Sequence, residues 1–209
     1  MRALLVPVKA FSRAKERLAG VLDDAERASL ARRLAAGVLA ASGSMPRFVV
    51  CDDDDVASWA TSSGATVIWT PGLGLSGAVR HGVERLAARG FRLVVVAHAD
   101  LPFAAALDAF GEPGLVTLAP DRRLDGTNVA AVPAGSGFAF AYGPGSFRRH
   151  RAAARRAGLP CRLVYDWNLA CDVDVAEDLG LLSQDPLVDG PPGVPGRGRA
   201  DTATVRRSP

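Results

Sequence analysis

Short apolar runs alternate with stretches of helical spacing along the first half of this chain, and this alternation constrains the fold more than any other feature. Residues 3–8 are apolar, and the segment "LDDAERASLARRLAAGVLAAS" that follows begins with acidic residues and repeats apolar residues at helical spacing. The same pair of patterns recurs in "RFVVC" before "DDDVASWATSSG", "ATVIW" before "LSGAVRHGVERLAARG", and "RLVVVAH" before "FAAALDAF". Strands that alternate with helices predict an α/β protein with a mostly parallel, Rossmann-like sheet covered by helices on both faces.

The rhythm changes after Gly114. Three short extended runs, "LVTLAP", "VAAVP" and "FAFAY", are separated by turn-rich segments with no helix-length insert between them. They predict a hairpin or mixed addition to the sheet, followed by the helix "SFRRHRAAARRAG" and the strand "CRLVYD". From Gln184 the chain is rich in Pro, Gly and Arg, so we expect one domain over residues 1–183 and a disordered tail over 184–209.

Composition narrows the class of protein. A chain of 209 residues with 48% apolar and 6% aromatic content suits one α/β domain. It contains no apolar stretch long enough to span a bilayer and no signal-peptide pattern, so we expect a cytoplasmic protein without a membrane partner. Cys51, Cys161 and Cys171 are scattered, which predicts neither a disulfide framework nor a zinc site. Much of the net charge of +3 lies in "SFRRHRAAARR" and in the tail, without interleaved aromatic residues. An anionic small substrate explains this charge as well as a polynucleotide would, and we expect no nucleic acid partner.

Lysine is confined to one segment. The chain has 23 arginines but two lysines, Lys9 and Lys15, and both follow the first expected strand. Ligands of open α/β sheets bind at the carboxyl ends of the strands, and a compact ammonium suits a crowded anion better than a guanidinium does. The two lysines therefore predict a phosphate-binding segment, with chance and a bias toward arginine as the alternative.

Carboxylates follow two later strands. Asp100 lies just beyond "VVVAHA", and Asp172 and Asp174 lie in "LACDVDVAEDL". Hard oxygen ligands such as these suit Mg²⁺, although aspartates at strand ends are also common helix caps. Capping and solvation are what we expect for the four aspartates at 52–55, and we expect His98 to be a packed or hydrogen-bonded structural residue.

Glycine-containing turns complete this set of polar groups. "GLGLSGAV" lacks the strict spacing of a dinucleotide fingerprint, so no nicotinamide cofactor is expected. "DGTN" and "YGPGS" each offer backbone N–H groups beside a hydroxyl, although each is equally an ordinary capped turn. Because no Ser-His-Asp or Cys-His arrangement is evident, the set favours phosphoryl or nucleotidyl transfer, which requires charge neutralisation more than a covalent nucleophile.

Five segments carry a resemblance to a known family. "PVKAFSRAKERLAG", "HADLP", "APDRRLDGTN", "YGPGSFRRH" and "LACDVDVAEDL" occur in order between about residues 3 and 182. Together they resemble the 2-phospho-L-lactate or phosphoenolpyruvate guanylyltransferases of deazaflavin coenzyme F(420) biosynthesis, relatives of the molybdenum-cofactor guanylyltransferases. The resemblance implies a nucleotide-diphosphosugar-transferase-like fold, a homodimer, and Mg²⁺-dependent transfer of GMP from GTP to phosphoenolpyruvate or 2-phospho-L-lactate with release of pyrophosphate.

The resemblance also implies roles for individual residues. Lys9 and Asp100 would be catalytic, with Lys9 meeting the phosphate of the acid. The remaining roles are acceptor binding for Thr127, Gly143 and Ser146, nucleotide binding for Lys15, Arg17, Gly74 and Ser76, and Mg²⁺ binding for Asp100, Asp172 and Asp174.

One segment departs from the family pattern. "GLSGAV" stands where "GLNAAL" is usual, with Ser76 in place of Asn and Gly77 in place of Ala, so nucleotide preference stays open. Two alternatives therefore accompany the main prediction: a nucleotidyltransferase for another acceptor such as 3-phosphoglycerate, and a catalytically silent homologue that binds nucleotide. The sequence does not distinguish phosphoenolpyruvate from phospholactate, because the two acids differ by one double bond.

Overall fold

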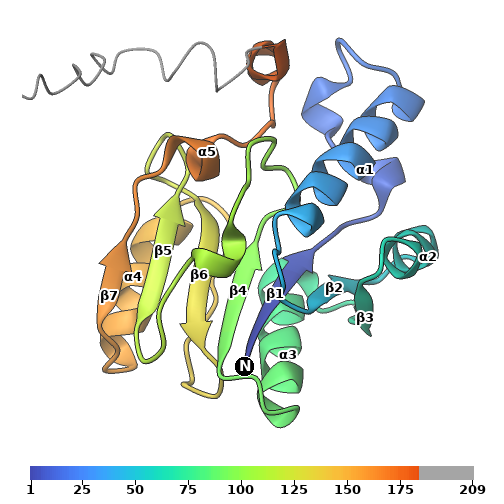
Figure 1. Cartoon of the computed structure of the whole chain (residues 1–209). Coiled ribbons are helices and arrows are strands. Elements are labelled where there is room, and N and C mark those ends of the chain that lie inside the picture. The colour runs from blue at the N-terminus through green and yellow to red at the C-terminus, as the bar shows by residue number, and fades with distance from the viewer. Residues whose placement is uncertain (184–209) are drawn as a thin grey trace, which may run out of the picture.

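A computed structural model describes residues 1–183, which form one seven-stranded sheet (Figure 1). The strands are β1 (Arg2–Pro7), β2 (Arg47–Cys51), β3 (Thr66–Trp69), β4 (Leu93–Ala97), β5 (Val116–Pro120), β6 (Thr127–Pro133) and β7 (Cys161–Leu163). Their order across the sheet is β3-β2-β1-β4-β6-β5-β7, and β6 runs antiparallel to both of its neighbours while the other pairings are parallel. The predicted α/β class and the mixed addition are both confirmed.

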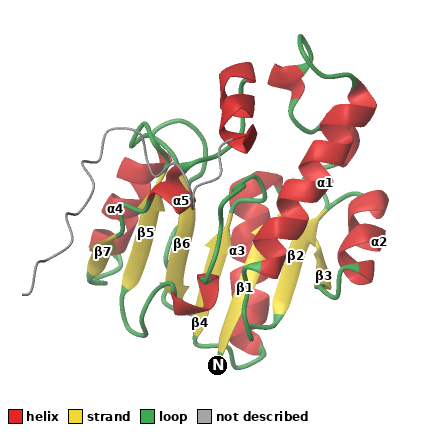
Figure 2. Ribbon diagram, turned by 45° about the horizontal axis from the view of Figure 1, so that its top comes forward, coloured by secondary structure: helices red, strands yellow, loops and turns green. Residues whose placement is uncertain are grey.

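Helices cover both faces of the sheet. They are α1 (Asp24–Ala40), α2 (Asp54–Ser62), α3 (Gly74–Ala88), α4 (Ser146–Arg156) and the short α5 (Trp167–Ala170). Residues of α1, α2 and α5 share one apolar core, and residues of α3 and α4 share the other, on the opposite face (Figure 2). Successive β1 residues alternate between the cores, since Leu4 joins the first and Leu5 the second. None of the described helices is both long enough and apolar enough to cross a membrane.

Local sequence determines where the first two helices begin. Asp23 accepts a hydrogen bond from Glu26 N–H (2.8 Å), and the Glu26 carboxylate accepts one from Asp23 N–H (2.9 Å), which is a capping box at the start of α1. Asp53 accepts from Val56 N–H (3.1 Å) and caps α2, so the capping function expected for the aspartates at 52–55 is confirmed for this one.

Two expected elements are absent. The segment "FAAALDAF" was expected to be a helix, but it contains only the 3-10 turn Leu107–Ala109, because Leu107 N–H bonds to Ala41 O at the end of α1 and Ala106 has a positive φ of 49°. The run "FAFAY" at 138–142 was expected to be a strand, but it pairs with no strand of the described chain. Side chains satisfy its backbone instead, as the site below shows. The predicted tail lies outside the described residues.

Candidate functional site

The carboxyl ends of β1, β2 and β4 lie side by side, because these strands are parallel neighbours. Two adjoining pockets, of about 340 and 380 Å³, open at this edge. They have six lining residues in common, namely Pro7, Val8, Lys9, Arg13, Glu16 and Leu75. Lys9 therefore stands where the two pockets meet, which is the position that a cation bridging two anionic ligands would need.

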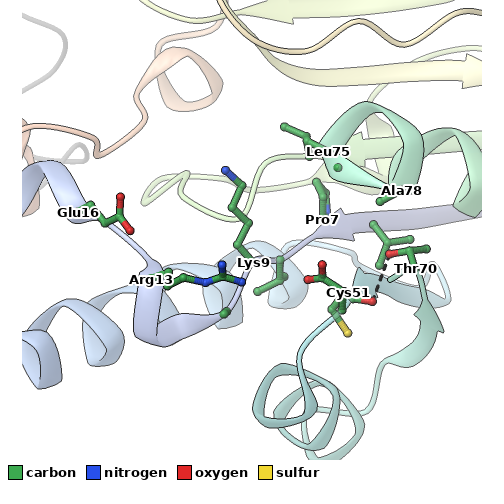
Figure 3. Close-up of a pocket in the computed structure, with 13 residues that line it drawn as sticks. Pro7, Lys9, Arg13, Glu16, Cys51, Thr70, Leu75 and Ala78 are labelled. Carbon is green, nitrogen blue, oxygen red and sulfur yellow. Dashed lines mark hydrogen bonds between the residues drawn. The ribbon is translucent and has the colours of Figure 1, made fainter. Parts of the chain in front are cut away.

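We call the first of these the β2 pocket, because Cys51 and Asp52 at the end of β2 line it together with Thr70 and Gly74 (Figure 3). Thr70 is buried, and both its N–H (2.8 Å) and its hydroxyl (3.2 Å) donate to Cys51 O, which fixes the turn beyond β3. Lys9 and Arg13 come from the segment after β1, across the pocket from Thr70. The lining thus combines apolar side chains with the cationic groups of Lys9 and Arg13 and the carboxylates of Asp52 and Glu16.

The second is the β4 pocket, and it contains a cluster of charges. Lys15 donates from Nζ to Asp100 Oδ2 (2.7 Å) and to Asp174 Oδ1 (3.2 Å), and Arg17 lies 3.8 Å from the Asp174 carboxylate. Burial alone would lower the pKa of Lys15, but the two carboxylates raise it. Burial likewise opposes ionisation of Asp100, yet the charge of Lys15 holds the pKa of Asp100 below its usual value. Both groups are therefore charged at neutral pH.

Asp172 adds a third carboxylate to this region. Burial, and then the charges of Asp100 and Asp174, raise its pKa, so these two carboxylates repel that of Asp172. Asp100 Oδ1 is buried and has no hydrogen-bond partner in residues 1–183. An unpartnered carboxylate oxygen, and three carboxylates of which Lys15 pairs with only two, fit a divalent cation.

The same region limits how many protein ligands such a cation would have. Within residues 1–183, no group of three His, Cys, Asp or Glu side chains is arranged to hold a metal ion. Asp174 is already bonded to Lys15. Mg²⁺ usually takes one or two protein carboxylates and completes its shell with water and substrate phosphates, so Asp100 and Asp172 fit as a pair. The role of Asp174 as a ligand stays a prediction.

Two buried polar side chains hold these carboxylates in place. Asn128, 4% exposed, donates from Nδ2 to Leu169 O (3.0 Å) and Ala170 O (3.1 Å), while its main-chain O accepts from His98 N–H (2.9 Å). It thereby joins the segment before Asp100 to the segment before Asp172. Sequence analysis singled out "DGTN" for its glycine and hydroxyl and missed this amide.

Asp178 is the second of these side chains. It accepts hydrogen bonds from Asp174 N–H (2.8 Å) and Val175 N–H (3.0 Å) and pairs with Arg122. Burial alone would raise its pKa, but these hydrogen bonds and Arg122 lower it. No local sequence pattern predicts this ion pair, because Arg122 and Asp178 lie far apart in the chain.

The two glycine-hydroxyl turns lie next to each other and bond mostly to themselves. Gly145 N–H donates to the Asp125 carboxylate (2.9 Å), and Thr127 N–H donates to Ser146 Oγ (3.0 Å). Thr127 and Ser146 are 1% and 2% exposed and line neither pocket. Most N–H groups of these segments therefore bond within the protein, which supports the alternative that the segments are ordinary capped turns. Gly143, in the segment 142–146, has a φ of 102°, and its N–H has no acceptor in the described chain.

Side chains also order the neighbouring segment 138–142. Tyr142 N–H donates to Ser76 Oγ (2.9 Å), and Arg149 donates to Ala141 O (2.9 Å) and Tyr142 O (3.1 Å). Ser76 lines neither pocket, whereas Gly74, two residues earlier, lines the β2 pocket. His98 packs its ring against Tyr142 at 5.1 Å, so it is packed as expected. Its Nε2, however, is buried with no hydrogen-bond partner in the described chain, and it lines the β4 pocket, so a purely structural role stays a prediction.

His150 lies under this segment and makes stability depend on pH. Burial lowers its pKa to about 4, assisted by the charges of Arg149 and His98, and the ring of Tyr142 packs against it at 4.9 Å. The unfolded chain, whose histidine pKa is near 6.5, binds more protons between pH 4 and 6.5 than the folded chain does. The free energy of unfolding should therefore fall by up to about 3 kcal/mol as the pH drops through this window.

Urea unfolding of the wild type and of His150→Asn, measured across pH 4 to 7, tests this predicted loss of stability. His81→Gln is the control and should keep the wild-type slope, while an unchanged slope in His150→Asn would contradict the prediction.

Comparison with known proteins identifies the family. The family model described as "Guanylyl transferase CofC like" matches residues 1–184. The phosphoenolpyruvate guanylyltransferase of Sphaerobacter thermophilus is 37% identical over 189 residues, covering 86% of this chain and 91% of that protein. This chain belongs to the CofC-like guanylyl transferase family. It is a nucleotidyltransferase, as the sequence predicted.

One further relative and two solved structures are also similar to this chain. The 3-phospho-D-glycerate guanylyltransferase of Phenylobacterium zucineum is 34% identical, covering 89% of this chain and 91% of that protein. Among solved structures, a nucleotidyl transferase from Methanothermobacter covers 87% of this chain and 95% of its own, with a TM-score of 0.62 at 14% identity. A proposed nucleotide-diphospho-sugar transferase from Desulfovibrio desulfuricans has a TM-score of 0.72 at 19% identity, covering 90% of this chain and 89% of its own. These two likenesses confirm the predicted fold.

Proposed function

We propose that this protein transfers GMP from GTP to phosphoenolpyruvate or 2-phospho-L-lactate, with release of pyrophosphate, in the biosynthesis of coenzyme F(420). The observation that carries the proposal is the position of Lys9 at the meeting point of the two pockets, in a chain that matches the CofC-like family over residues 1–184. The β2 pocket, which contains Gly74, is assigned to the nucleoside, and the β4 pocket to the phosphates of GTP.

Charge sets the requirements of this reaction. The attacking group is a phosphate oxygen that is already anionic, so no general base is needed, and repulsion between the acceptor and the triphosphate is the main obstacle. Lys9 offsets this repulsion from the junction of the pockets, and Lys15 and Arg17 meet the triphosphate from the β4 pocket. Asp100 and Asp172 would hold Mg²⁺, which neutralises charge on the phosphates when it is bound.

The acceptor is assigned to the turns that adjoin β6. Gly143 has an N–H without an acceptor in the described chain, and the Ser146 hydroxyl accepts one hydrogen bond while keeping its own proton to donate. Together with Thr127, they supply donors for the carboxylate and phosphate of a small acid. Because Thr127 and Ser146 are buried here, binding requires the acid to reach them through a local shift of the 142–146 segment.

The identity of the acid is tested by direct comparison. The protein is incubated with GTP and Mg²⁺ and with phosphoenolpyruvate, 2-phospho-L-lactate or 3-phospho-D-glycerate, and pyrophosphate is measured. We expect release with one of the first two. A similar rate with 3-phospho-D-glycerate alone would support the second candidate, which the Phenylobacterium relative favours. GTP binding without release for any acid would support the silent homologue.

Replacing Asn128 should weaken metal binding rather than nucleotide binding. In Asn128→Ala the hydrogen bonds to Leu169 O and Ala170 O are lost, so Asp172 is no longer held beside Asp100. We expect the Mg²⁺ concentration for half-maximal activity to rise roughly tenfold, with the KM for GTP little changed. Mn²⁺ binding, measured by electron paramagnetic resonance without substrate, should weaken in parallel. Asn168→Ala, at an exposed position on α5, is the matched control, and equal Mn²⁺ affinity in both variants would contradict the prediction.

A further inference from the structure

His150 is a fully buried histidine whose two ring nitrogens both have partners. It lies on α4 and is 0% exposed. Its Nε2 accepts a hydrogen bond from Ala141 N–H (2.9 Å), and its Nδ1 lies 3.0 Å from Thr127 Oγ1. A neutral imidazole that accepts at Nε2 carries its proton on Nδ1. Nδ1–H therefore donates to the hydroxyl of Thr127.

This assignment determines what the Thr127 hydroxyl can do. Because Oγ1 accepts from His150, its own proton must go to another acceptor, and residues 1–183 provide none. Ser146 Oγ is in the same state, since it accepts from Thr127 N–H and has no second partner in the described chain. Two adjacent hydroxyls that each retain a proton to donate form a site suited to an anion.

The position of Thr127 connects this pair to the functional site. Thr127 begins β6, and β6 pairs with β4 such that Val129 lies beside Ala97. The hydroxyl is thus at the sheet edge where Asp100 lies. The rings of His98, Tyr142 and His150 pack in succession, at 5.1 and 4.9 Å, and join Thr127 to the β4 pocket that His98 lines.

We propose that His150 is a positioning residue for the acceptor: its Nδ1–H tautomer keeps the Thr127 hydroxyl as a donor to an anionic oxygen of the phosphorylated acid. The neutral state that this requires is favoured by burial. Water is largely excluded at Thr127, so a hydrogen bond from its hydroxyl to an anion is stronger than at an exposed site. The role of His150 in binding the acceptor rests on the proposed function, whereas the assignment of its tautomer does not.

Two substitutions separate the two hydrogen bonds of the ring. His150→Gln places an amide near the position of Nε2, so it keeps an acceptor for Ala141 N–H and loses the donor to Thr127. His150→Asn places an amide near Nδ1 and does the reverse. We expect His150→Gln to raise the KM for the acid roughly tenfold, while kcat and the KM for GTP stay within about twofold. His150→Asn should keep an acceptor KM near that of the wild type.

A third substitution and a spectrum complete the test. Thr127→Val should raise the acceptor KM as His150→Gln does, and the double variant should show no further increase, because the two changes remove one interaction. Long-range ¹H–¹⁵N spectra of the ligand-free protein should show His150, assigned with His150→Gln, protonated at Nδ1 and not at Nε2 at pH 7. Equal KM increases in His150→Gln and His150→Asn, or protonation at Nε2, would overturn the proposal. If the wild type uses no acid, the proposed function fails, and the spectrum alone then decides the tautomer.

Discussion

The substitution Asp100→Asn should abolish Mg²⁺-dependent pyrophosphate release, with a loss of at least about a hundredfold in kcat. The change keeps the shape of the side chain and removes its charge. In the structure that charge is present at neutral pH, since Lys15 lowers the pKa of Asp100, and Oδ1 has no partner in residues 1–183. An amide would bring at most one neutral oxygen to the cation, so both metal binding and charge balance are lost.

The matched control for this prediction is Asp55→Asn, an equivalent change at an exposed position on α2. Pyrophosphate release is measured for both variants over a range of Mg²⁺ concentrations, with thermal melting to verify folding. Near-normal turnover of folded Asp100→Asn would remove Asp100 from the site.

The second large effect is expected at Lys9. Lys9→Ala should lower kcat/KM for the acid by about 10²–10³. The reason is that, among the residues that line both pockets, Lys9 alone offers a compact ammonium on an exposed side chain. Lys9→Arg keeps the charge but spreads it over a planar guanidinium, and we expect it to lose at least about tenfold.

The conservative variant also tests the original observation that lysine is confined to this segment. Initial rates for Lys9→Ala and Lys9→Arg are compared with those of Arg156→Ala, an exposed change on α4 that should have no effect. If Lys9→Arg matches the wild type, the scarcity of lysine reflects only the bias of this chain toward arginine.

The structure also distinguishes the two lysines in a way the sequence did not. Sequence analysis placed both in one phosphate-binding segment, and the resemblance assigned Lys9 to the phosphate of the acid and Lys15 to the nucleotide. Lys9 is exposed between the pockets, whereas Lys15 has a left-handed backbone conformation (φ 56°) and a largely buried ammonium paired with Asp100 and Asp174. That pairing depends on residues 85 and 159 positions away, which no local pattern reveals.

The fold could be predicted wherever a pattern is local. The apolar run of β4, the Asp23 cap of α1 and the periodicity of α3 each lie within a few residues, and each element forms as expected. The predictions for "FAAALDAF" and "FAFAY" were wrong because distant groups decide their backbone: Ala41 O binds Leu107 N–H, and His150 binds Ala141 N–H.

The candidate site shows the same division. The rule that ligands bind at the carboxyl ends of strands located Lys9 and Asp100, which line the pockets as expected. Asn128 and His150, in contrast, act through hydrogen bonds to segments that the sequence does not place beside them. Thr127 was named through the resemblance, but its burial and its bond to His150 could be seen only in three dimensions.

The central claim is that this CofC-like protein moves GMP onto a phosphorylated acid, and mass spectrometry of a single reaction tests it most directly. The wild-type protein is mixed with GTP, Mg²⁺ and phosphoenolpyruvate or 2-phospho-L-lactate, and the mixture is quenched quickly and analysed. We predict one pyrophosphate for each GTP consumed, and a product in which the phosphate of the acid and GMP are joined through a P–O–P anhydride. Consumption of GTP without a guanylylated acid, or no consumption with either acid, would contradict the account.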